Sequence, residues 1–158
     1  MPEPLADSVM NSIGQAAELY HQLIILAAPA ASGKTAALQE IQRRTGAALV
    51  NVNLQLSQRM LDLTERQRAL QISRLLSEIV SASATDMILL DNTEILFDVP
   101  LKQDPLRLLK GLSRSKTVIA AWSGYIEGDH LVYAAPDHPE YKRYPTGDFL
   151  VVTPDVTA

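Results

Sequence analysis

The stretch Leu23-Ile-Ile-Leu-Ala-Ala-Pro-Ala-Ala-Ser-Gly-Lys-Thr35 decides the fold of this chain. Its apolar first half is typical of a buried strand, and the residues that follow it have the periodicity of a helix. Residues 28–35 match the motif G-x-x-x-x-G-K-[ST] at every defining position except the first, where Ala28 replaces glycine. The alternative interpretation is an ordinary strand, turn and helix with an accidental Gly-Lys-Thr.

Each residue type in this motif has a chemical reason. Backbone N–H groups of the loop surround a phosphate, and the next helix presents the positive end of its dipole to that anion. Gly33 lets the backbone approach the phosphate, Lys34 reaches the β and γ oxygens, and the Thr35 hydroxyl ligates Mg²⁺. We therefore expect ATP to contact Ala28, Pro29, Ala30, Ala31, Ser32, Gly33, Lys34 and Thr35.

Length and composition limit the remaining classes of protein. A chain of 158 residues fits one domain, and its 47% apolar residues form no run of membrane-spanning length. The first residues lack the basic and apolar regions of a signal peptide, so we expect a cytoplasmic protein without a membrane partner. The absence of cysteine excludes disulfides and thiolate chemistry. A net charge of −4 argues against a protein that coats nucleic acid by charge alone.

Strand and helix patterns alternate along the chain. This alternation predicts an α/β fold: one P-loop NTPase-like domain over residues 1–158, with three layers and a mainly parallel five-stranded sheet. A first helix is expected at about 6–20 and the core at about 22–152. Strands are expected at about 22–28, 47–53, 87–90 and 117–122, with further candidates at 130–134 and 149–152. Helices are expected at about 34–45, after a capping box at Thr64–Gln67, and at about 104–113, whereas 136–145 forms a loop or short helix.

A second part of a nucleotide site is expected at Asp91. Three apolar residues, Ile88, Leu89 and Leu90, form a short buried strand that ends in this aspartate. At the carboxyl edge of a parallel sheet, Asp91 would hold Mg²⁺ together with Thr35. The alternative is an aspartate that only begins a turn after a buried strand.

The position after Asp91 departs from many P-loop ATPases, which place there a glutamate that polarises the attacking water. This chain has Asn92, and Glu94 follows two residues later. Glu94 either points back at the γ-phosphate as a catalytic residue or caps a helix that starts at Asn92. The polar residues that end the second strand are not acidic: they are Asn51, Asn53 and Gln55. The sequence therefore supports nucleotide binding better than hydrolysis.

A third polar element is expected between the loop strand and the Asp91 strand. The strand that starts at Thr117 ends in Ser123, which is the natural sensor of a γ-phosphate, and Gly124 behind it indicates a turn. An arginine from a neighbouring subunit often completes such a site. Arg143 is the preferred candidate over Arg114, although solvated surface charge explains both equally well.

These motifs together resemble a family. The segments Pro29-Ala-Ala-Ser-Gly-Lys-Thr35, Leu89-Leu-Asp-Asn-Thr-Glu-Ile-Leu-Phe97, Trp122-Ser-Gly124 and Leu131-Val-Tyr-Ala-Ala-Pro-Asp-His-Pro-Glu-Tyr141 are similar to BrxF. BrxF proteins are the small P-loop proteins of type 3 BREX bacteriophage-defence systems, with a core like that of AAA+ and origin-recognition ATPases. The resemblance covers residues 8–152. It implies a role beside a DNA methyltransferase, a larger ATPase and a phosphatase-like protein.

AAA+ and origin-recognition ATPases add a helical lid after the last strand, which we do not expect here because only Thr153-Pro-Asp-Val-Thr-Ala158 follows it. A partner or a second copy of the chain is then expected to cover the nucleotide. We predict an ATP- and Mg²⁺-dependent assembly switch or a weak ATPase. The alternatives are a small-molecule kinase and a DNA-binding subunit. DNA would contact basic stretches at 59–74 and 102–116, which are also explained as solvated helix faces.

Overall fold

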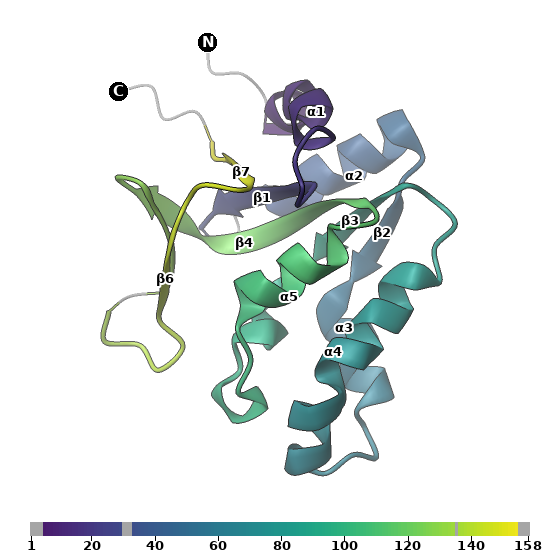
Figure 1. Ribbon diagram of the computed structural model, residues 1–158, viewed down its shortest axis with the longest axis vertical. Helices are drawn as coiled ribbons and strands as arrows, with labels where there is room; N and C mark the ends of the chain where they lie inside the picture. Colours follow the sequence, from purple (N-terminus) through teal and green to yellow (C-terminus); the bar gives the residue numbers. More distant parts are fainter. Residues whose placement is uncertain (1–4, 30–32, 135, 155–158) are drawn as a thin grey trace.

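The computed structural model describes residues 5–29, 33–134 and 136–154 (Figure 1). Its helices are α1 (Leu5–Ala16), α2 (Lys34–Thr45), α3 (Val52–Arg59), α4 (Glu65–Ser81) and α5 (Pro105–Leu112), with 3-10 turns η1 (Thr93–Phe97) and η2 (Val99–Leu101). Its strands are β1 (Leu23–Ala28), β2 (Ala48–Asn51), β3 (Met87–Asp91), β4 (Thr117–Glu127), β5 (His130–Tyr133), β6 (Lys142–Pro145) and β7 (Leu150–Val152).

The described strands form one mostly parallel sheet. Five of them follow the order β2-β3-β4-β1-β7, and every neighbouring pair on this path is parallel. β5 pairs antiparallel with the end of β4, and β6 pairs antiparallel with β5. The expected α/β class and mainly parallel sheet are confirmed, but the sheet has seven strands in the described residues rather than five. The candidate strands at 130–134 and 149–152 are present as β5 and β7, whereas β6 was not expected. β5 and β6 form a hairpin that continues the sheet from the end of β4.

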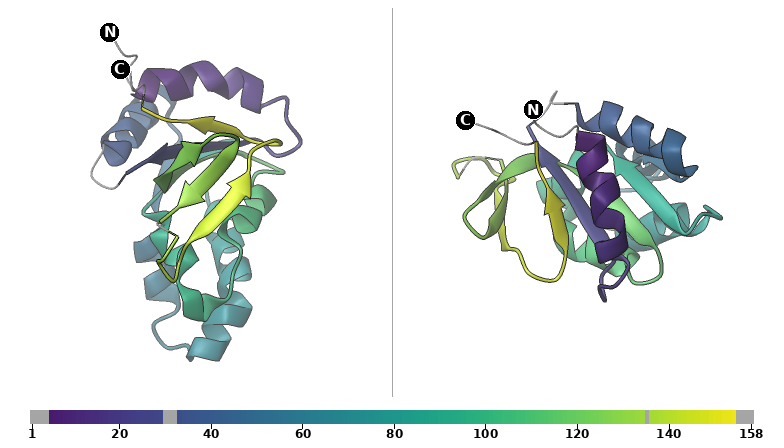
Figure 2. Two further views of the ribbon diagram at one scale, coloured as in Figure 1. Left: turned by 90° about the vertical axis from the view of Figure 1, so that its left-hand side faces the viewer. Right: turned by 90° about the horizontal axis from the view of Figure 1, so that it is seen from above.

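Helices cover both faces of the parallel strands. From above, α1 and α2 lie across one face (Figure 2), and α3, α4 and α5 lie on the other (Figure 1). Alternate residues of β1 divide accordingly: Leu23 and Ile25 pack with the α3–α5 side, whereas Ile24 and Leu26 pack with the α1–α2 side. All four are fully buried, and each such side chain contributes about 2 kcal/mol.

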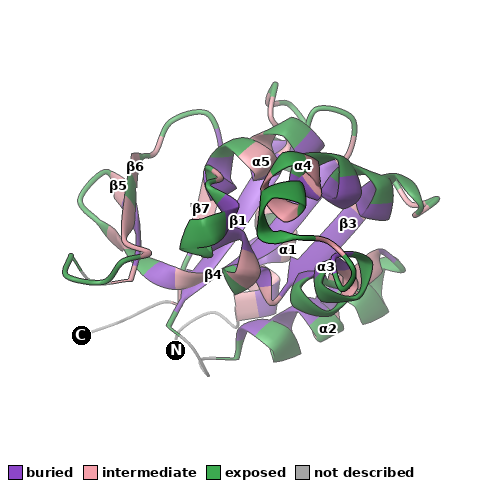
Figure 3. Cartoon of the chain, turned by 90° about the horizontal axis from the view of Figure 1, so that it is seen from below, coloured by how far each residue is buried: buried purple, intermediate pink, exposed green. Residues whose placement is uncertain are grey.

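Helix α4 forms where the sequence predicts it. Thr64 accepts a hydrogen bond from the Gln67 backbone N–H, and the Gln67 side chain accepts one from the Thr64 N–H, so the capping box is complete. The predicted apolar face is buried, and Figure 3 shows the opposite face of the helix exposed; the buried residues are Ile72, Leu75, Leu76, Ile79 and Val80.

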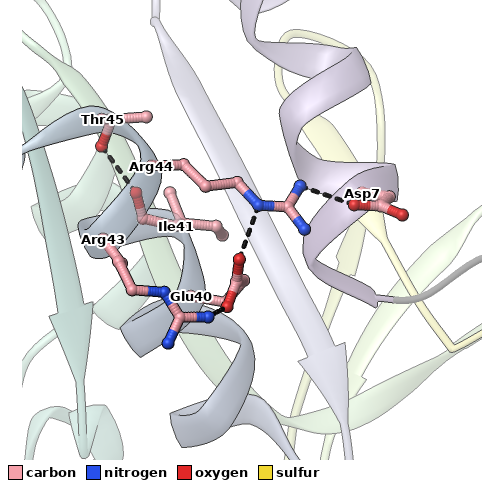
Figure 4. Close-up of polar contacts among 6 residues, drawn as sticks. All are labelled: Asp7, Glu40, Ile41, Arg43, Arg44 and Thr45. Carbon is pink, nitrogen blue, oxygen red and sulfur yellow. Dashed lines mark hydrogen bonds and ion pairs between the residues drawn. The ribbon is translucent and has the colours of Figure 1, made fainter.

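Polar contacts join α1 to α2 (Figure 4). Arg44 donates to Asp7 of α1 at 2.6 Å and to Glu40 at 2.7 Å, and Arg43 also pairs with Glu40. Because these side chains are partly exposed, the pairs orient the helix more than they stabilise it. The buried Val9 and Ala16 of α1 provide the apolar contact with the sheet.

The ends of the first helix and of the second strand differ from the expectation. The first helix ends at Ala16 rather than near residue 20, and Tyr20 is exposed. The second strand ends at Asn51 because the Asn51 side chain accepts a hydrogen bond from the Leu54 N–H and caps helix α3, which was not expected.

The end of β4 also differs. The strand continues to Glu127, so Gly124 lies inside a strand and not in a turn. Trp122 is fully buried, as expected for a core aromatic, and its Nε1–H donates to the Val132 carbonyl at 3.1 Å. The segment expected as a loop or short helix includes strand β6. Within the residues that the structure describes, no helix combines the length and apolarity needed to cross a membrane.

Candidate functional site

Predicted site residues from three strands gather at the carboxyl edge of the parallel sheet. Asp91 ends β3, Ser123 follows in β4, and Ala28 ends β1, with Ala28 and Ser123 aligned in register. As predicted, β4 lies between β1 and β3. The alternation of side chains along each strand directs all three residues to the side of the sheet that α1 and α2 cover. Helix α2 therefore begins on the side toward which Asp91 and Ser123 point.

The centre of this edge is a contact between Thr35 and Asp91. The Thr35 hydroxyl donates a 2.6 Å hydrogen bond to Asp91 Oδ2, although the two residues are 56 positions apart in the chain. The other carboxylate oxygen, Oδ1, accepts from the Asn92 backbone N–H at 2.9 Å. Asp91 is buried. Sequence reasoning predicted this pair, and the fold brings it together.

Lys34 is also buried at this edge. Its ammonium donates to the carbonyls of Ala28 at 2.8 Å and Pro29 at 2.7 Å. Burial lowers the pKa of Lys34, whereas the negative charges of Glu94 and Asp91 raise it. The lysine therefore lies folded onto the chain segment that precedes α2, within electrostatic reach of both acids.

The loop positions themselves divide into two groups. Gly33 precedes α2 with φ 89, in the left-handed region that glycine adopts without strain. Ala28 is buried as the last residue of β1 and has no left-handed backbone, so its methyl group is accommodated where the motif has glycine. Ala30, Ala31 and Ser32 lie outside the described residues.

Glu94 lies in the first turn of η1, which begins after Asn92 adopts a left-handed backbone with φ 53. Glu94 is exposed and is the acid in this first turn, so its position agrees with the alternative of an acid near the amino end of a helical turn. Its charge also acts on Lys34, whose pKa it raises.

Sequence reasoning missed Thr93 and the backbone of Asn92. The buried Thr93 hydroxyl donates to the Ala121 carbonyl at 2.5 Å, and the Asn53 N–H donates to the Asn92 carbonyl at 3.1 Å. These bonds fix the turn after Asp91 between β4 and α3. The sequence does show polar residues after β2 and β3, and these were the signal for a contact there. Their partners, however, are backbone groups, which no sequence motif specifies.

The two candidate arginines lie away from the Thr35–Asp91 contact. Arg143 is in β6, where it donates to Glu127 at 2.9 Å, and this hydrogen bond raises the pKa of its guanidinium. Arg114 precedes the amino end of β4 and stacks over the Tyr20 ring at 5.6 Å. Within one chain, the hairpin holds Arg143, and Arg114 lies at the opposite sheet edge from Ser123.

Some basic side chains of the two basic stretches make contacts within the chain. Lys110 pairs with Asp148 at 2.9 Å, and Lys116 donates to the carbonyls of Val80 and Ser83. In the other stretch, Arg74 pairs with Glu78 at 2.7 Å. These contacts favour the interpretation of both stretches as helix faces.

The oxygen atoms at the edge suit a hard cation. A hydroxyl and a carboxylate are donors that Mg²⁺ accepts, and Mg²⁺ usually keeps several waters and phosphate oxygens besides one or two protein ligands. Thr35 and Asp91 supply one hydroxyl and one carboxylate of this kind. Among the described residues, no group of three or more His, Cys, Asp or Glu side chains could hold a metal.

No model of a known protein family matches this chain, and a search of curated proteins finds no match to it either.

Proposed function

We propose that this chain binds ATP with Mg²⁺ at the edge formed by residues 28–35 and Asp91, as a P-loop protein. The observation that carries the proposal is the 2.6 Å contact between Thr35 and Asp91. A hydroxyl at the start of a helix beside a carboxylate at the end of a buried parallel strand is the arrangement that Mg²⁺–nucleotide sites require. The absence of an Asn-Lys-x-Asp sequence favours adenine over guanine.

Three side chains have separate tasks in this proposal. Thr35 and Asp91 hold the cation, which when bound offsets the negative charge of the phosphate oxygens. Lys34 exchanges the carbonyls of Ala28 and Pro29 for the phosphate oxygens. Because the pKa of Lys34 is lowered by burial, a phosphate anion that replaces neutral carbonyls restores the ammonium's preference for its charged form.

Hydrolysis is proposed to be weak. The position after Asp91 is Asn92, whose amide has no basic oxygen that could take a proton from water. Glu94 is the nearest acid on the following turn, and Ser123 is the polar group on the strand between the two halves of the site. We assign Glu94 to water activation and Ser123 to sensing the γ-phosphate.

The resemblance to BrxF supplies the context for this site. We propose that the chain acts as a nucleotide-dependent assembly switch in a BREX-type phage-defence complex, with an AAA+-like core. Other proteins of that system or a second copy of the chain would cover the nucleotide. In a second copy, Arg143 is the candidate that reaches the phosphates.

A titration of ATP and Mg²⁺ by calorimetry, with size measured by light scattering, tests this function. Wild type should bind, whereas Lys34→Ala and Thr35→Val should each bind at least about tenfold more weakly, which corresponds to about 1.4 kcal/mol. Thr45→Val is the matched control, because Thr45 lies at the other end of α2, where its hydroxyl donates to the Ile41 carbonyl and accepts from the Ala47 N–H. Binding that is unchanged in Lys34→Ala would overturn the proposal, and a monomer with and without nucleotide would remove self-assembly.

A further inference from the structure

A small hollow lies directly beside the residues that begin the loop. It has a volume of about 270 Å³ and is lined at the carboxyl ends of three neighbouring strands. Its lining includes Ala28 at the end of β1 and Pro29 after it, Tyr125 and Ile126 of β4, and Thr153 and Pro154 after β7. The hollow therefore shares Ala28 and Pro29 with the Lys34 contact at the candidate site.

The residues that line the hollow suit an apolar, flat ligand. The described residues that line it carry no charged side chain, and their exposed surface is mainly apolar. Tyr125 lies in the part of β4 that pairs with β5, beyond the parallel strands, and it is 43% exposed. The ring therefore lines the hollow and remains open to a ligand there.

The alternation of side chains along β4 places Tyr125 on the same side of the sheet as Ser123 and the start of α2. Trp122 and Ile126 belong with the α3–α5 side, so Ser123 and Tyr125 point to the side where α2 begins. The extension of β4 beyond Ser123 is what presents this ring. A strand that ended at Ser123, as the sequence suggested, would leave no aromatic side chain at the hollow.

We propose that this hollow receives the aromatic base of a nucleotide, with Tyr125 as the stacking residue. The inference rests on the proposed function, because the phosphates of the same nucleotide would lie at residues 33–35. Continuity through Ala28 and Pro29 is the reason to assign both sites to one ligand. The larger hollows among α3, α4, α5 and η2, of about 490 to 530 Å³, share no lining residue with the loop.

The test separates the base from the phosphates. ATP, inorganic tripolyphosphate and adenosine are titrated into wild type, Tyr125→Phe and Tyr125→Leu, the first two with Mg²⁺. Loss of a base-stacking ring weakens binding about five- to hundredfold. Tyr125→Leu should therefore bind ATP and adenosine more weakly by that factor and bind tripolyphosphate like wild type. Tyr125→Phe keeps the ring and should bind all three like wild type.

Tyr20→Leu is the matched control, because it removes another exposed tyrosine that lies before β1, at the far end of that strand from the hollow. Equal affinity of wild type and Tyr125→Leu for ATP and adenosine would overturn the base site. Failure of tripolyphosphate to bind wild type would contradict the proposed phosphate site instead. In that case adenosine binding that depends on Tyr125 would still support the hollow, and its absence would overturn it.

Discussion

At Gly124, strand β4 has no room for a side chain. A Cβ there would lie 1.9 Å from the Val132 carbonyl oxygen and 2.9 Å from the Trp122 ring. Val132 cannot yield easily, because its carbonyl accepts the hydrogen bond from the buried indole. We expect Gly124→Ala to lower the free energy of unfolding by about 3 kcal/mol, measured by urea denaturation with the fluorescence of Trp122, the single tryptophan.

Gly111→Ala is the control for this substitution. Nothing lies within 4 Å of a Cβ at Gly111, which is exposed in α5. Because alanine favours a helix over glycine, this variant should gain about 0.5 to 1 kcal/mol. Similar effects at the two glycines would contradict the close contact at Gly124.

Because the pKa of Tyr133 is raised, we expect the free energy of unfolding to fall at alkaline pH. Burial first, and then the charges of Glu140 and Glu94, raise its pKa from 10.0 to about 12. Between these values the folded state binds more protons than the unfolded state, so stability is fully present below pH 10 and falls as pH rises toward 12.

We expect Tyr133→Phe to remove this part of the pH dependence while keeping the ring that stacks on Phe97. Urea denaturation of both proteins on either side of pH 10 measures the difference. Tyr144, whose pKa burial and a hydrogen bond to Asp104 also raise, contributes equally to both proteins. Parallel pH profiles for wild type and variant would show that Tyr133 does not titrate as described.

At the scale of a single element, the capping box of helix α4 gives a prediction that can be tested directly. Thr64→Ala leaves the Gln67 N–H without its acceptor at the first turn, and should cost about 1 kcal/mol of stability. Ser73→Ala, at an exposed position inside the same helix, should cost nothing, because alanine is the better helix former. Thermal unfolding followed by circular dichroism compares the two, and equal midpoints would contradict the role of the cap.

Helices and strands were predictable from the sequence where the apolar residues follow a single spacing, either that of a helix or that of a strand. The face from Ile72 to Val80 repeats at helical spacing, and structure and prediction agree. Helix α3 was missed because Val50 and Val52 favour a strand by propensity, whereas the cap at Asn51 acts through a single side-chain hydrogen bond. The length of β4 was missed because Gly124 has the composition of a turn, and only its packing against Trp122 reveals why it is glycine in a strand.

For the molecule as a whole, the meeting of Thr35 and Asp91 followed from topology. Parallel strands put their carboxyl ends at one edge, so a motif after one strand and an acid after another must approach each other. The hydrogen-bond partners of Lys34 could not be predicted from the sequence. Its hydrogen bonds to Ala28 and Pro29 are made to backbone carbonyls, and any lysine at this position can form them.

Lys34 also gives the prediction that concerns the stability of the whole molecule. A ligand at about 100 times its Kd stabilises the folded state by about 2.7 kcal/mol, which for a chain of this size raises Tm by about 5 to 10 °C. We expect ATP with Mg²⁺ to produce this shift in wild type. Lys34→Met should lower the shift to about half or less, whatever it does to the protein without nucleotide, because binding that is at least about tenfold weaker leaves at most about 1.4 kcal/mol of the increment. Lys142→Met in β6 should keep the full shift. Scanning fluorimetry with ATP, with and without a chelator, measures all three proteins, and a shift of full size in Lys34→Met would mean that nucleotide binds elsewhere.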